Sequence, residues 1–219
     1  MWNQNVFEKS YSQNPKYLVV LLHGYGANAT DLIELSDFFN EALPDSHFLA
    51  PNAIENWEGG FPDSYQWFSL SNGFERKSLE EISGNIKSSN DTLRQYIDAK
   101  LQELNLQAEN LFLIGFSQGA MMAKYQALTN PKKIAGVIGF SGKLISPELT
   151  GEKILSKPKI CMIHGREDMV VDFDNFLASQ EAMKSLNIEF EAHALNNLGH
   201  SINMEGIKIA CDFLKKSTQ

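Results

Sequence analysis

A serine flanked by spaced glycines is the pattern in this chain with the clearest chemical meaning. Gly115, Ser117 and Gly119 form the sequence G-x-S-x-G, which follows the apolar run 111–114 and precedes an apolar segment of helical period. A tight strand-to-helix turn needs neighbours without a Cβ atom, and it lifts the serine hydroxyl into the open. The amino terminus of the helix then offers free N–H groups to a developing negative charge. The pattern predicts a nucleophilic serine. Ser141, in G-F-S-G, lacks the second spaced glycine, and we interpret it as a turn at a strand end.

Such a serine needs a base to take its proton. Three histidines follow Ser117 along the chain, namely His164, His193 and His200. His164 ends one predicted strand and His193 lies within another, so we interpret both as structural. His200 lies in a polar loop between the last predicted strand and the last predicted helix, and it is the candidate base.

An acid should orient the imidazole and stabilise its charged form. The predicted strand 159–163 is followed by H-G-R-E-D, and Asp168 at the end of this run is the candidate acid. Glu167, Asp172 and Asp174 lie nearby and remain alternatives on the sequence alone.

An oxyanion needs two N–H donors. One should come from Gln118, directly after the serine, and the other from the loop after an early strand. Residues 21–26 read L-L-H-G-Y-G, a buried strand followed by a glycine-rich turn, and Tyr25 is the candidate donor. Because the turn has no G-x-G-x-x-G, the pattern argues against a dinucleotide site.

The elements that would position these residues alternate between short apolar runs and longer segments of helical period. We expect strands at 17–22, 47–50, 111–114, 135–140, 159–163 and 188–194, with an antiparallel edge strand at 6–9. The last of the parallel runs alternates more and should lie near an edge. Ser78 followed by Glu81 is typical of a capping box that begins a long helix, and further helices are expected around 121–128 and 202–214. This alternation predicts a mainly parallel sheet covered on both faces, with chemistry at the carboxyl ends of its strands.

The bulk composition narrows the class of protein. The chain has 219 residues and a net charge of -8, so we expect one domain over 1–219 and no nucleic-acid partner. Cys161 and Cys211 form no C-x-x-C pair, and we expect two buried, reduced thiols. The polar amino terminus does not resemble a signal peptide and no apolar run reaches the length of a membrane span, so we expect a cytoplasmic protein.

Residues 51–78 are rich in glycine and aromatic side chains and have little period. One interpretation is a loop that packs its own rings; the other is a lid or wall of a hydrophobic acyl slot. The rings belong to Trp57, Phe61, Tyr65, Trp67, Phe68 and Phe74.

These pieces together resemble the carboxylesterase/phospholipase family that includes acyl-protein thioesterases. The matching segments are LLHGYG, APNA, GFSQGA, FSGKL, HGREDMVV and LGHSI, in family order between about residues 16 and 214. The resemblance implies an α/β-hydrolase fold without a large cap domain, and a triad of Ser117, Asp168 and His200. It also implies main-chain donors at Tyr25 and Gln118, a substrate-pocket pair at Trp67-Phe68, and no metal or organic cofactor.

The chain departs from the family in a few places. Ala120 stands where a second glycine is common, Tyr25 where leucine is frequent, and Ala27 where aspartate often follows the glycine. The implied reaction is hydrolysis of acyl esters or thioesters, with a lipid or an S-acylated protein as substrate. Alternatives are a lysophospholipase, a small-ester esterase, or a hydrolase-fold binding protein with a blocked triad. Peripheral contact with a membrane and a homodimer are further partner interactions that stay open.

Overall fold

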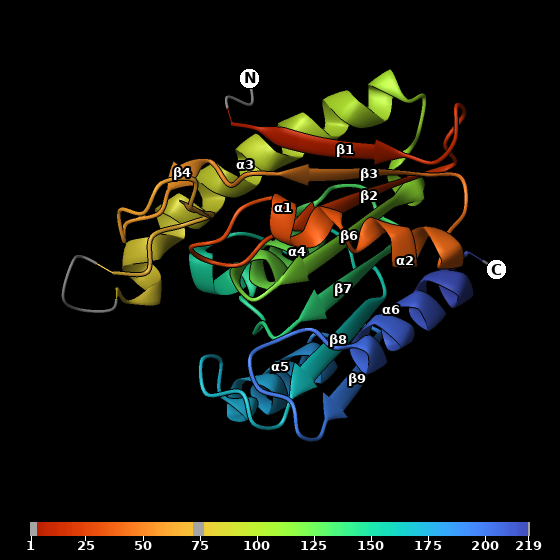
Figure 1. Ribbon diagram of the computed structural model, residues 1–219. Helices are drawn as coiled ribbons and strands as arrows, with labels where there is room; N and C mark the ends of the chain where they lie inside the picture. The colour runs from red at the N-terminus through yellow and green to blue at the C-terminus, as the bar shows by residue number, and fades with distance from the viewer. Residues whose placement is uncertain (1–3, 72–76, 219) are drawn as a thin grey trace.

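The computed structural model describes residues 4–71 and 77–218 and is built on a seven-stranded sheet. Its strand order is β1-β3-β2-β6-β7-β8-β9, and every neighbouring pair is parallel except β1 with β3 (Figure 1). The strands are β1 (Val6–Ser10), β2 (Tyr17–Leu22), β3 (Ser46–Pro51), β6 (Leu111–Phe116), β7 (Gly136–Phe140), β8 (Ile160–Gly165) and β9 (Phe190–Leu195). The predicted parallel sheet and its antiparallel edge strand are both confirmed.

Helices cover both faces of this sheet (Figure 1). One face carries α1 (Thr30–Ile33), α2 (Ser36–Ala42) and α6 (Met204–Ser217), while the other carries α3 (Leu79–Glu103), α4 (Gln118–Thr129) and α5 (Phe173–Ser185). Short 3-10 turns, η1 (Ala108–Asn110) and η2 (Pro147–Thr150), complete the chain. The described residues contain no large cap domain, as the α/β-hydrolase expectation requires.

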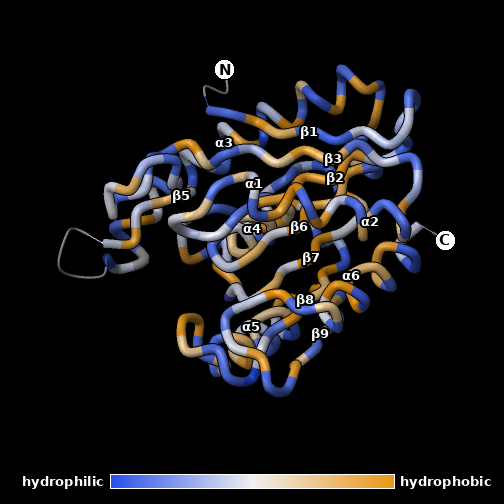
Figure 2. Tube along the Cα trace, viewed as in Figure 1, coloured by the Kyte–Doolittle hydropathy of each residue, from blue (hydrophilic) through white to orange (hydrophobic). Residues whose placement is uncertain are grey.

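The alternation of side chains along β2 shows how the two cores arise. Leu18, Val20 and Leu22 join the apolar cluster beneath α3, α4 and α5, whereas Val19 and Leu21 join the cluster beneath α2 and α6. Successive strand residues point to opposite faces, so a continuous apolar run supplies both cores at once. Figure 2 shows the resulting concentration of hydrophobic residues along the central strands.

The long helix α3 begins where the capping signature places it. The Ser78 hydroxyl accepts a hydrogen bond from the Glu81 N–H, and the Glu81 carboxylate accepts one from the Ser78 N–H at 2.6 Å. Ile82, Ile86 and Leu93 then continue one buried stripe along the helix. Local capping and helical period are sufficient to define this element.

The segment 51–78 contains structure that its weak periodicity does not indicate. It forms a two-stranded antiparallel hairpin of β4 (Glu55–Asn56) and β5 (Tyr65–Gln66). The hairpin lies at the edge of the molecule where the parallel strands end (Figure 1). Phe74, one of the aromatic residues singled out above, lies outside the described residues.

Other expectations need adjustment. The helices α1, α2 and α5 were not predicted from the sequence. Cys161 is fully buried as expected. Cys211 is only half-buried, because it packs at the edge of the apolar cluster beneath α6. Both cysteines are free thiols. No helix within the described ranges, α3 included, combines the length and apolarity needed to cross a bilayer.

Candidate active site

The turn between β6 and α4 holds Ser117 in a conformation that few residues adopt. Its φ is 52° and its ψ is -116°, a positive-φ geometry for a residue that is not glycine. A Cβ atom on Gly119 would overlap the Leu22 carbonyl, and one on Gly115 would overlap the Gly119 carbonyl. The two spaced glycines are therefore required by close backbone approach. Such strain is typical of functional turns.

Three side chains meet at this turn. The His200 Nε2 atom lies 3.0 Å from the Ser117 hydroxyl, and its Nδ1 atom lies 2.8 Å from the Asp168 Oδ2 atom. Because the carboxylate only accepts, Nδ1 carries the proton and Nε2 is free to accept one from Ser117. The Phe116 ring packs on the imidazole, with ring centroids 4.8 Å apart.

Asp168 is distinguished from its competitors by burial. Its side chain has no exposed surface, whereas Glu167, Asp172 and Asp174 are exposed. The N–H groups of Val170 and Val171 each donate to the other carboxylate oxygen, at 2.9 Å. Burial would raise the pKa of Asp168, but these hydrogen bonds and the one from His200 outweigh it and hold the pKa below its usual value.

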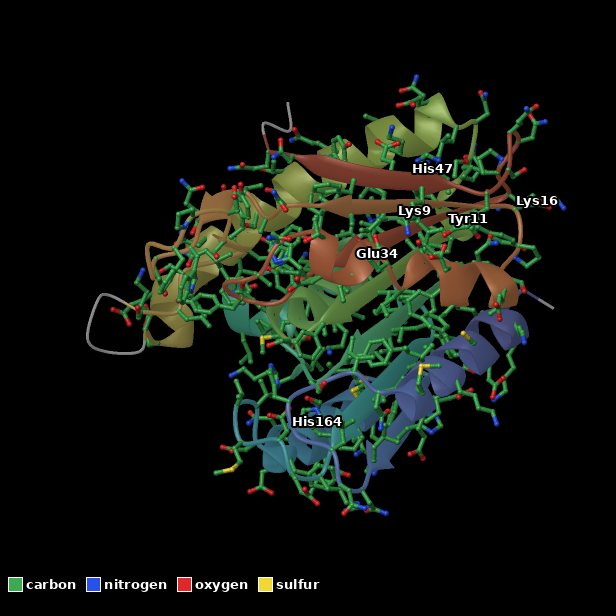
Figure 3. All side chains as sticks on the ribbon, in the orientation of Figure 1. Lys9, Tyr11, Lys16, Glu34, His47 and His164 are labelled. Carbon is green, nitrogen blue, oxygen red and sulfur yellow. The ribbon has the colours of Figure 1, made fainter. Side chains whose placement is uncertain are left out.

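A second histidine contacts the same carboxylate. The Nε2 atom of His164 donates to the Val171 carbonyl at 2.8 Å and lies 3.3 Å from Asp168 Oδ2. Burial lowers the pKa of His164, so the imidazole is held neutral. Figure 3 labels His164 among the side chains of the β8 half of the sheet. Its position at the end of a strand agrees with the structural interpretation, but its contact with the acid was not anticipated.

The two candidate oxyanion donors lie in the loops that lead to this site. Gln118 is the first residue of α4, directly after Ser117, and Tyr25 lies in the turn after β2. Within residues 4–71 and 77–218 the main-chain N–H of Tyr25 and that of Gln118 have no intramolecular acceptor. Both are therefore available to a ligand.

The Trp67-Phe68 pair lies directly beneath these loops. Both side chains are fully buried, so in this structure they support the site from below and have no surface open to solvent. The Gln118 side chain accepts from the Trp67 N–H at 2.8 Å and donates to the Phe68 carbonyl at 2.7 Å. The Trp67 indole donates to the His23 carbonyl at 2.9 Å. These contacts join the turn after β2 to the start of α4.

His23 is a residue of this site that the sequence analysis did not single out. It is fully buried, its Nδ1 atom donates to the Gly24 carbonyl at 2.8 Å, and its Nε2 atom accepts from the Ala53 N–H at 2.9 Å. The bond that Nε2 accepts requires the neutral ring, and burial lowers the pKa of His23 to about 4. A histidine inside a glycine-rich turn after a buried strand was the available signal.

One cluster elsewhere has donor types that suit a metal. Ligand atoms of Cys161, Glu191 and His193 lie within 4.8 Å of one another across β8 and β9. The Cys161 thiol is buried, which raises its pKa to about 12, and Lys216 lies 3.6 Å from the Glu191 carboxylate. A cation would have to displace the thiol proton and compete with the lysine. We therefore assign no metal to this cluster.

Comparison with known proteins places this geometry in context. The sequence profile of the family described as "Phospholipase/Carboxylesterase" matches residues 3–218. Esterase YpfH of Escherichia coli is 29% identical, covering 90% of this chain and 82% of the relative. Acyl-protein thioesterase 1 homolog 1 of Dictyostelium discoideum is 28% identical, covering 91% and 89%. The crystal structure of esterase PE8 superposes with a TM-score of 0.87 at 33% identity, covering 97% of each chain.

The family match spans almost the whole chain, and the relatives that share it are named as esterases and thioesterases. The chain therefore belongs to the phospholipase/carboxylesterase family of α/β-hydrolases and is a hydrolase that acts on ester bonds.

Proposed function

We propose that this esterase works through an acyl-enzyme on Ser117, with His200 as base and Asp168 as the acid that orients it. The continuous chain from Ser117 Oγ through His200 to Asp168, at 3.0 Å and 2.8 Å, is the observation that carries the proposal. His200 takes the hydroxyl proton as the serine attacks the acyl carbonyl, and then gives it to the leaving group. Water, activated by His200, releases the acid from the serine.

The charge that develops on the carbonyl oxygen is stabilised by the N–H groups of Tyr25 and Gln118. Neither N–H has an acceptor among the described residues, and Gln118 is at the amino terminus of α4, where the helix dipole favours negative charge. The mechanism uses no metal and no organic cofactor.

We propose acyl esters and thioesters as substrates, with the acyl group carried by a lipid or an S-acylated protein. Support comes from the thioesterase relative from Dictyostelium discoideum and from the Escherichia coli esterase, which are similar over nearly the same residues. Trp67 and Phe68, the expected pocket pair, would support the acyl site from behind, because neither side chain has surface open to solvent. We further propose that residues 1–219 act as one catalytic domain and that the protein works in the cytoplasm. A membrane surface and a second copy of the chain are proposed as further contacts.

The nucleophile is tested by labelling with a fluorophosphonate and reading the intact mass. Wild type should gain one label and Ser117→Ala none, with kcat lowered by about 10⁶-fold on the precedent of a serine protease. Ser141→Ala is the matched control, because Ser141 also has a positive φ at a strand end and is buried. It should label like wild type.

Residual activity of Ser117→Ala above a tenth of wild type would overturn the assignment. A folded wild type that takes no label would point instead to a blocked, binding role. A chain-length series of nitrophenyl esters beside acyl thioesters then defines the substrate. Preference for short chains without thioester cleavage would favour a small-ester esterase, and cleavage of lysophospholipid a lysophospholipase.

A further inference from the structure

The Glu58 carboxylate collects hydrogen bonds from two distant parts of the chain. The Tyr25 phenol and the Ser69 hydroxyl both donate to it. The N–H groups of Leu70 and Ser71 donate to its Oε1 atom at 3.0 Å, and the Ser71 hydroxyl does so at 3.1 Å. The carboxylate therefore bridges the turn after β2 and the segment after β5.

This carboxylate stays ionised at any working pH. Burial would raise the pKa of Glu58, but the hydrogen bonds from Ser69, Tyr25, Leu70 and Ser71 outweigh it and lower the pKa to about 2. An ionised acceptor makes stronger hydrogen bonds than a neutral one. Its contact with Tyr25 is thus a charge-assisted bond that holds across the physiological range.

Tyr25 differs from the two residues after it in how it is bonded to the hairpin. The Gly26 N–H donates to the Tyr65 carbonyl at 2.9 Å, and the Tyr65 N–H donates to the Ala27 carbonyl at 2.9 Å. Those two residues are therefore paired with the β4–β5 hairpin. In the part of the chain that the structure describes, the main chain of Tyr25 has no such backbone bond. Its polar tether is the phenol.

The ring of Tyr25 is also packed into place. It meets Trp57 edge to face, with centroids 5.8 Å apart, and Trp57 in turn stacks on Phe61 at 5.7 Å. A Cβ atom on Gly26 would lie 3.2 Å from the Trp57 ring, so the turn and the hairpin are in close contact. The hairpin therefore packs against the turn, and the bond from the phenol to Glu58 adds a polar contact between them.

We propose that Glu58 is a positioning residue for the oxyanion hole, acting through the Tyr25 phenol. This rests on the proposed function, in which the Tyr25 N–H is one of the two donors. A donor stabilises the transition state only if its direction is set before the reaction, and rotation of an untethered peptide would lose that advantage.

Two substitutions test the tether, and only the first leaves the bonds from the segment after β5 to Glu58 intact. Tyr25→Phe keeps the ring and the N–H but removes the phenol, and Glu58→Gln keeps the size of the side chain but removes the charge. Each should lower kcat by about tenfold, which is less than the 10²- to 10³-fold typical of deleting a donor. KM should change by less than about twofold. The double variant should be no worse than the more impaired single variant, because both substitutions act on the same contact.

A trifluoromethyl ketone separates positioning from general loosening. Its tetrahedral adduct places an oxyanion in the hole, so its inhibition constant should rise by the factor by which kcat falls. Tyr11→Phe is the matched control, because the Tyr11 phenol also bonds a carboxylate, that of Asp37, and also contacts Ser36. Figure 3 labels Tyr11 beside β1, in the opposite half of the sheet from His164. This control should keep wild-type kcat and inhibition.

The outcomes are distinct. If wild type takes no fluorophosphonate label, the proposed function fails. If wild type is labelled but Tyr25→Phe and Glu58→Gln keep kcat within about twofold, or lose kcat without weaker ketone binding, the positioning role is overturned. If Glu58→Gln does not fold, Tyr25→Phe alone decides between these results.

Discussion

Asp168 lies between two imidazoles that have different tasks. His200 contacts Ser117 and exchanges the proton in the proposed mechanism, whereas His164 is fully buried and donates to the Val171 carbonyl. Val171 in turn donates its N–H to Asp168, so His164 is linked to the acid through Val171. His164 is thus expected to hold the acid loop rather than to take part in the reaction.

Substitution of His164 by leucine tests this division of roles. The variant leaves the buried Val171 carbonyl without its donor, which should cost about 1–3 kcal/mol and lower Tm by about 2–10 °C. Because Asp168 keeps its bonds from Val170 and Val171, kcat/KM should fall far less than in Ser117→Ala. Thermal unfolding and ester hydrolysis measure the two effects. A loss of activity equal to that of Ser117→Ala would instead place His164 in the reaction itself.

At the scale of the elements, the junction of β6 and α4 sets the backbone geometry of Ser117, the proposed nucleophile. The helix begins one residue after Ser117, and Gly119 in its first turn rests against the Leu22 carbonyl of β2. The neighbouring strand therefore sets the size of the residue that the helix tolerates there. The close approach that shapes the turn at Ser117 is a contact between elements.

Gly119→Ala should separate this contact from ordinary helix propensity. The added methyl overlaps strand backbone, and overpacking of this kind typically costs about 1–3 kcal/mol or more. We expect reduced stability and slower fluorophosphonate labelling. Gly84→Ala in α3 is the control, because its Cβ would meet nothing within 4 Å, and alanine should stabilise that exposed helix by about 0.5–1 kcal/mol. Equal behaviour of the two variants would contradict the packing argument.

At the scale of the whole molecule, the apolar core contains a buried lysine, whose charged form is unfavourable there. Lys124 in α4 is fully buried, and its Nζ atom donates to the Gly142 carbonyl at 3.0 Å. Burial lowers its pKa to about 7 from an ordinary 10.5. Between these values the unfolded chain binds more protons than the folded one, so this lysine makes stability rise with pH over that window.

Lys124→Met should remove that dependence. Below pH 7 the folded protein carries a buried ammonium whose penalty is on the order of 5 kcal/mol, and methionine relieves it apart from the lost bond to Gly142. Urea unfolding at pH 6.5 and pH 9 should show a more stable variant at the lower pH and a smaller rise between the two. Lys208→Met, at an exposed position on α6, is the control and should keep the wild-type slope. An unchanged slope in Lys124→Met would mean that the lysine stays charged in both states.

The sequence by itself determined the strands of the main sheet, three of the helices and the candidate nucleophile. The strand order along the chain, the capped start of α3 and the G-x-S-x-G turn depend on residues within a few positions of one another. Backbone preference, hydrophobic period and steric demand act over that range, so they can be read directly. The antiparallel edge strand at Val6–Ser10 agrees with the strand expected at 6–9.

Only the tertiary structure decided which of these residues meet. His200 and Ser117 are 83 positions apart, and Asp168 is distinguished from three nearby carboxylates by its burial and its bond to His200. The bond between Tyr25 and Glu58 spans 33 positions and depends on a short hairpin without a clear period. Such contacts follow from the order of strands in the sheet and from the packing of loops at their carboxyl ends, which no local pattern encodes.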